Sequence, residues 1–178
     1  MSVLNEEQID YINEVLHDLS HETDRAAAVL VGAEIDRVLG KILERFLLPV
    51  RSKASSPLLE QDGPLGNLAS RIELVYRLGL VSTTMHRELH LLRKIRNLFA
   101  HRVKGVAFDV LPVSDLVKSL HVPQWLLGGN PAMAQPLGTR KSQFIVSGAT
   151  AVAWLTSLAN KVERRKESEN EFRGKDAT

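Results

Sequence analysis

Residues 24–46, with the sequence DRAAAVLVGAEIDRVLGKILERF, decide the fold of this chain. Their apolar side chains recur at intervals of three and four residues, which is the period of one face of an α-helix. Thr23 or Asp24 suits the N-cap of this helix, and Pro49 cannot continue it. A helix of this length spans a small domain, so we expect it to be the spine of a helical bundle. Residues 51–66, which are rich in Ser, Pro and Gly, then form a connecting loop.

Helical patterns lie on both sides of this spine. Asn5 and Gln8 have the spacing of a capping box, and the apolar pattern that follows predicts an amphipathic helix to about Leu19. A second, shorter pattern predicts a helix over residues 68–78. Gly79 stands where a left-handed residue would end this short helix.

The middle of the chain contains one long helical pattern and a less regular segment. Ser82 or Thr83 caps the long pattern, which we extend to about His101. Residues 106–110 are expected to form a short extended piece. Residues 112–120, which begin with Pro, suit a small helix.

The patterns predict a single all-α, helical-bundle domain over residues 1–162, since no internal repeat and no strand-like alternation is visible. Residues 121–140 form a Gly/Pro-rich insertion before the last helix, which starts at about Ser142. Three apolar residues of this insertion are expected to fold over the helices: Trp125, Leu126 and Leu127. Residues 163–178 alternate charges without apolar anchors, and we expect a disordered tail there.

Composition excludes several classes of protein. The chain has 178 residues, no cysteine and a formal net charge of +2. Without cysteine there are no disulfides, thiolate zinc sites or cysteine nucleophiles. The sequence has no signal-peptide pattern and no apolar run of about 20 residues, so we expect a cytoplasmic protein with no membrane partner. No block of like charge resembles a nucleic-acid-binding arm.

A helical wheel of residues 86–101 separates an apolar face from a polar one. The expected core face consists of Leu91, Leu92, Ile95, Leu98 and Phe99. The opposite side carries a polar stripe that consists of His86, His90, Asn97 and His101. Arg93 and Arg96 flank this polar stripe, so imidazoles, an amide and cations share one surface.

Three plain interpretations of these polar residues have to be weighed. Polar side chains outside a core face are often merely solvated. His86 and His90, at i and i+4, have the spacing of metal ligands, but no Asp or Glu lies on the same stripe to complete a ligand set. We therefore predict no metal site and no cofactor. Arg96 would pair with Glu34 or Glu44 of the spine helix.

The hexad Arg96-Asn97-Leu98-Phe99-Ala100-His101 resembles the signature of HEPN domains, which is Arg, a polar residue, three further residues and His. Many of these small helical proteins are metal-independent endoribonucleases. More of the chain resembles a narrower family. Residues 62–67, 70–80 and 91–101, together with the helix from 24 to 46, are similar to the bacterial mannitol operon repressor family. This resemblance covers roughly residues 20 to 110.

The resemblance implies an all-helical, HEPN-like regulator of sugar-alcohol operons that lacks a recognisable DNA-reading element. The sequence agrees, because it contains no helix-turn-helix pattern, no basic recognition helix and no basic arm. We therefore expect repression through another regulatory protein, without direct sequence-specific DNA binding. The candidate interface residues are His86, His90, Arg93 and Arg71.

A metal-independent endoribonuclease of the toxin or defence type is the alternative hypothesis. In it His101 transfers protons, Arg96 stabilises phosphoryl oxygens and Asn97 orients the phosphate or the imidazole. Arg96 and His101 lie about 140° apart around the helix, so a homodimer is needed to bring both to one phosphate. Small residues around Gly32 and Ala33 also suit a close helix contact between two copies. With an aromatic content of 5%, the chain offers RNA few stacking surfaces, so we favour a regulator over an enzyme.

Overall fold

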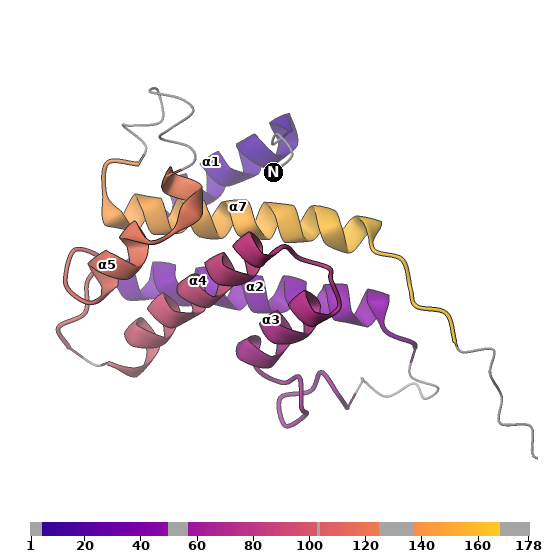
Figure 1. Ribbon diagram of the computed structural model, residues 1–178. Coiled ribbons are helices and arrows are strands. Elements are labelled where there is room, and N and C mark those ends of the chain that lie inside the picture. The colour runs from indigo at the N-terminus through magenta and orange to yellow at the C-terminus, as the bar shows by residue number, and fades with distance from the viewer. Residues whose placement is uncertain (1–4, 50–56, 103, 125–136, 168–178) are drawn as a thin grey trace, which may run out of the picture.

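The computed structural model describes residues 5–49, 57–102, 104–124 and 137–167. Within these ranges the chain forms helices and turns and contains no strand, which confirms the predicted all-α class. The helices are α1 (Glu6–Ser20), α2 (Asp24–Phe46), α3 (Leu68–Arg77), α4 (Thr83–His101), α5 (Val113–Lys118) and α7 (Arg140–Lys161) (Figure 1).

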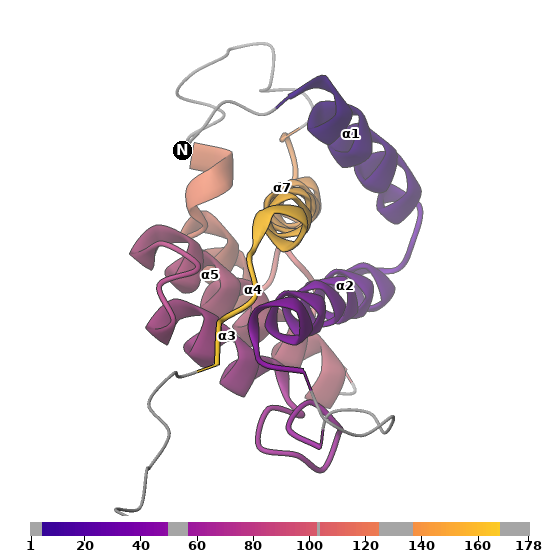
Figure 2. The same cartoon turned by 90° about the vertical axis from the view of Figure 1, so that its right-hand side faces the viewer.

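The two longest helices, α2 and α7, lie side by side and organise the bundle (Figures 1 and 2). On one side, α1 packs against α7. On the other, α3 and α4 pack against α2, and α5 lies against α4 and α7. Spine helix α2 is therefore covered by neighbours on several sides, as its length and small residues predicted.

Helix α7 is the most deeply enclosed element. Its sequence is rich in small residues, and a Cβ atom added at Gly148 would collide with the side chain of Val31 on α2. Over one 18-residue window its mean hydropathy is 1.2, which would suffice for a membrane span, yet 67% of that window is buried inside the protein. This burial is typical of a core helix.

Three phenylalanine rings from distant parts of the sequence meet in the core. The ring of Phe108 lies 4.8 Å from that of Phe99 on α4 and 5.0 Å from that of Phe144 on α7. All three side chains are almost completely buried. Phe108 belongs to a turn, so the predicted extended piece at residues 106–110 is wrong: burying this ring decides the local path of the chain.

Most helix boundaries agree with the capping signals in the sequence. Asn5 and Gln8 form the predicted capping box, and Gly79 has a φ of +72° directly after α3. The last helix begins at Arg140, two residues before the predicted start. Thr139 is its N-cap, and Ser142 completes a capping box from within the first turn.

Two predicted irregular segments are described in part. Residues 121–124 are helical, whereas the expected packing of Trp125, Leu126 and Leu127 lies outside the described residues. At the other end, the backbone N–H of Arg165 donates to the carbonyl of Phe46 at 2.8 Å. The first residues of the predicted tail therefore contact the end of α2, and residues 168–178 lie outside the described residues.

Candidate functional site

The last turn of α4 is held in place by the start of α2. Arg25 donates to the carbonyl oxygens of Phe99 and Arg102, both at 2.5 Å, and so satisfies carbonyl groups that a helix end leaves free. The neighbouring Asp24 accepts a hydrogen bond from the N–H of Phe108 at 3.2 Å. The segment that carries the hexad is thus fixed by contacts from residues more than 70 positions away.

Arg96 lies between α4 and α2, with its aliphatic stem over Gly32. A Cβ atom at Gly32 would stand 2.6 Å from Cγ of Arg96, so only glycine permits this approach. Nη1 of Arg96 donates to Oδ1 of Asn97 at 3.1 Å. The expected pairing with Glu34 is not made, because the carboxylate of Glu34 accepts two hydrogen bonds from Arg37 of its own helix, at 2.6 and 2.9 Å.

Asn97 and His101 line a shallow, open surface depression of about 260 Å³. We call it the basic depression, and its lining residues are Arg93, Lys94, Asn97, Leu98, His101 and Arg102. Arg96 is absent from this lining, in agreement with the angle of about 140° that separates it from His101 on the helix. The hexad is therefore divided between a surface and a helix–helix contact.

Arg93 is the member of the basic depression with the most restricted side chain. Its Nε is buried and has no hydrogen-bond partner among the residues that the structure describes. A guanidinium with a free donor beside a cationic surface suits contact with an acidic group.

Arg71, the remaining predicted interface residue, is used inside the chain. Its guanidinium donates to the carbonyl oxygens of Leu65, Asp36 and Leu59, at 2.8, 3.0 and 2.9 Å. It also forms an ion pair with the Asp36 carboxylate at 3.0 Å, and only 12% of the side chain is exposed. Arg71 joins α2, α3 and the turns of residues 57–67.

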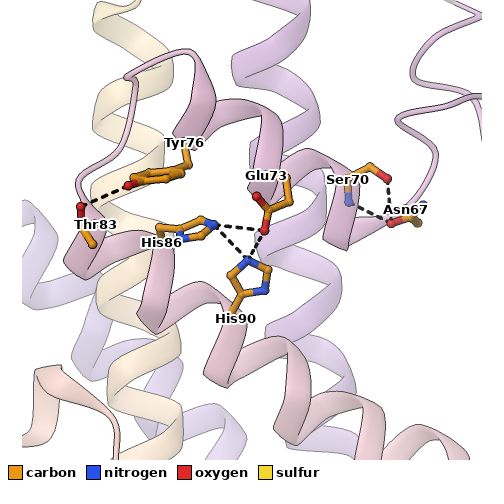
Figure 3. A network of polar contacts seen from close by, with 7 residues as sticks. All are labelled: Asn67, Ser70, Glu73, Tyr76, Thr83, His86 and His90. Atoms are coloured by element: carbon orange, nitrogen blue, oxygen red, sulfur yellow. Dashed lines mark hydrogen bonds and ion pairs between the residues drawn. The ribbon is translucent and has the colours of Figure 1, made fainter.

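The N-terminal half of the polar stripe faces α3 (Figure 3). Oε1 of Glu73 lies 2.9 Å from Nε2 of His90 and 3.3 Å from Nε2 of His86. The two Nε2 atoms are 3.0 Å apart, and Tyr76 stacks on the ring of His86 at 4.1 Å. Loss of solvent contact opposes ionisation of Glu73, but the hydrogen bonds from the two imidazoles outweigh it and lower the pKa of this carboxyl.

Glu73 is the acidic group that the search of the polar stripe did not find. The stripe lies on α4 alone, whereas Glu73 comes from α3, 13 positions before His86. Its own position on a short amphipathic helix gave no signal that it would face the two imidazoles.

Glu88 is a second polar residue that the sequence analysis missed. Its side chain is only 2% exposed, and its carboxylate accepts hydrogen bonds from the N–H groups of His121 and Val122, at 2.8 and 3.2 Å. Ser147 of α7 donates to it at 2.5 Å. A signal was present, since position 88 falls between the buried residues of the same helical face. Glu88 is a structural residue that caps the helical turn starting at His121.

A larger cavity of about 420 Å³ lies between α1, α2 and α7. Its lining is mainly polar and includes Tyr11, Glu34 and Arg37. The hydrogen bond from Arg37 lowers the pKa of Glu34, and partial burial opposes that shift. Burial and the nearby charge of Glu34 raise the pKa of Tyr11. The lining combines charges of both signs, so the cavity has no clear preference for an anion or a cation.

Comparison with curated proteins finds two similar relatives, both named mannitol operon repressor. They come from Escherichia coli strain K12 and from Escherichia coli O6:H1, and each is 31% identical over 119 residues. The matched region is 64% of this chain and 60% of the relative, so the chain spans about three fifths of the length of these proteins.

Comparison with solved structures finds a chain of the X-ray structure of the MtlR–HPr complex from Escherichia coli. The TM-score is 0.59, the sequence identity is 20%, and the alignment covers 83% of this chain and 99% of the other. At this identity the likeness concerns the fold. The family model described as mannitol repressor matches residues 13–137, which include α2, α3, α4 and α5. The chain belongs to the mannitol repressor family.

Proposed function

We propose that this chain is a regulator of the mannitol-repressor type that acts by binding another protein. The observation that carries the proposal is the family match over residues 13–137, which contains the whole of α4 and its basic depression. The curated relatives are named as repressors of an operon, and the solved neighbour is a complex with HPr. A regulator of transcription works where transcription occurs, so we place this protein in the cytoplasm.

The basic depression is the surface that we assign to the partner. Three permanent cations surround it, at Arg93, Lys94 and Arg102, and no carboxylate is part of its lining. A cationic surface of this kind accelerates encounter with an acidic protein surface and favours it over a basic one. The depression is shallow and open, and this shape suits a protein surface better than it suits enclosure of a small substrate.

The proposal is tested by calorimetric titration of the purified chain with HPr. We expect saturable binding that weakens by about tenfold or more in Lys94→Glu, because the reversed charge opposes the same acidic surface. Lys41→Glu is the matched control, since Lys41 is a lysine of α2 outside the basic depression. Binding to HPr that neither substitution alters would place the contact elsewhere, and failure to bind HPr would contradict the proposal.

A metal-independent endoribonuclease is the second candidate. It is favoured by one observation: Asn97 and His101 line the basic depression together with Arg93 and Arg102, so an imidazole, an amide and two guanidinium groups reach one surface. Arg96 contributes to it through its hydrogen bond to Asn97. In a two-fold dimer the Arg96 of one copy could serve His101 of the other, with RNA as the ligand.

The two candidates are separated by an RNA cleavage assay in the presence of a chelator. If the site is catalytic, His101→Ala lowers the cleavage rate by about 100-fold or more, the usual scale for loss of a general acid or base. The fold should survive, because His101 is exposed. If the chain is a regulator alone, wild type cleaves no RNA under these conditions.

A further inference from the structure

The triangle formed by Glu73, His86 and His90 cannot be satisfied by protons alone. Each Nε2 atom carries either one hydrogen or one lone pair in the plane of its ring. If both nitrogens carry hydrogen, their 3.0 Å contact is repulsive. If one does not, its lone pair faces either the other nitrogen or the carboxylate oxygen. Protons can therefore make two of the three contacts favourable, but not all three.

A single cation at the centre would interact favourably with all three atoms. We propose that Glu73, His86 and His90 bind one divalent transition-metal ion of the zinc type. The ligand atoms lie within 4.8 Å of one another. Two imidazoles and one carboxylate are a ligand set that zinc accepts, with water in the fourth position.

The spacing of the three atoms fits such an ion after a small adjustment. Ligand atoms around a tetrahedral zinc ion with ordinary bond lengths are separated by about 3.3–3.5 Å. The observed separations are 2.9, 3.0 and 3.3 Å, so the side chains need to open by only a few tenths of an ångström. Side-chain rotations at these partly exposed positions supply a change of this size.

The surroundings are suited to a solvent-accessible metal site. The side chains of His86 and His90 are 20% and 28% exposed, and that of Glu73 is 55% exposed, so an ion and its water have access. The stacked ring of Tyr76 restricts the plane of the His86 imidazole, and its hydroxyl lies 3.4 Å from that of Thr83 (Figure 3). Because Glu73 belongs to α3 and both histidines to α4, the bound ion would link these two helices.

The chain itself offers a matched control for this site. His17 and His21 on α1 are also four residues apart, and their rings are 5.3 Å from each other. They are exposed, and among the described residues they are not part of a group of three potential ligands. A histidine pair at helical spacing is therefore present twice, but with a third converging ligand only at α4.

The experiment is calorimetric titration of the untagged, chelator-treated chain with ZnCl₂, and with CoCl₂ followed by visible absorption. We expect one ion per chain, a tetrahedral Co²⁺ spectrum and a melting temperature that rises by several degrees with Zn²⁺. His90→Ala and the milder Glu73→Gln should each lower the affinity by about tenfold or more. His17→Ala should leave it unchanged.

Circular dichroism and the melting temperature without metal show whether each variant keeps the fold. Glu73→Gln keeps the side-chain shape at a largely exposed position, so it tests the site even if a histidine variant is unstable. Three results would overturn the proposal: no binding by wild type, binding that Glu73→Gln and His90→Ala both retain, or an equal loss of binding in His17→Ala.

Discussion

At the scale of single residues, Glu88 is the side chain whose burial costs most and whose hydrogen bonds offset that cost. A charged group in the interior is tolerated only when its lone pairs have partners, and this carboxylate has two backbone donors and one hydroxyl donor. Glu88→Ala would leave the N–H groups of His121 and Val122 and the hydroxyl of Ser147 without that acceptor. We expect it to lower the free energy of unfolding by about 2–4 kcal/mol, measured by urea denaturation.

Glu14→Ala is the control for this prediction. Glu14 is also a helix glutamate, but it is exposed on α1, so its removal should change the free energy of unfolding by less than about 0.5 kcal/mol. Equal effects of the two substitutions would contradict the structural role of Glu88.

Gly32 permits the contact between α2 and the stem of Arg96. In an open helix Gly→Ala stabilises by up to about 1 kcal/mol, whereas overpacking costs about 1–3 kcal/mol. Since the added Cβ would stand 2.6 Å from Cγ of Arg96, we expect Gly32→Ala to be net destabilising. Thermal unfolding measures the effect. In the double variant with Arg96→Ala the overpacking should disappear, so additive effects of the two changes would refute the contact.

At the scale of elements, Arg71 holds the turns of residues 57–67 against α2 and α3. Lysine at this position keeps the charge but cannot reproduce three directed hydrogen bonds from a planar fork. We expect Arg71→Lys to lower the melting temperature by several degrees and to accelerate proteolysis within residues 57–67. Arg77→Lys at the end of α3 is the control. Unchanged proteolysis of the turns in Arg71→Lys would show that other contacts hold them.

At the scale of the whole molecule, we expect a homodimer. Part of the reason given by the sequence is met inside the chain, because Gly32 is covered by Arg96. Ala33 is exposed and Leu30 is 48% exposed, so a neighbouring part of the α2 surface is still open to a second copy. Light scattering at micromolar concentration should give twice the mass of the chain. A strict monomer would remove the nuclease mechanism that shares Arg96 and His101 between two copies.

The whole molecule also predicts how the chain behaves toward DNA. The faces of α2, α4 and α7 that carry most of the buried residues form the core, and the described chain presents no helix built to enter a major groove. Fluorescence anisotropy should show no preference for operator duplex over random duplex, and any weak binding should disappear with moderate salt. Tight, sequence-selective binding by the chain alone would contradict regulation through a partner protein.

The sequence alone determined the helical class and most of the boundaries, because these depend on contacts between residues close in the chain. Apolar spacing of three and four residues, the capping box at Asn5 and the left-handed Gly79 act over a single turn. The family resemblance followed from the same local segments, and the family match agrees with it.

Only the tertiary structure decided which polar residues come together. Arg71 became an internal clamp, Arg96 left the surface that holds His101, and Phe108 drew residues 106–110 into turns. Glu73 reached the two histidines from another helix. A helical wheel places side chains around one axis, whereas these contacts depend on how separate helices pack, and packing is fixed by the shape and burial of the whole core.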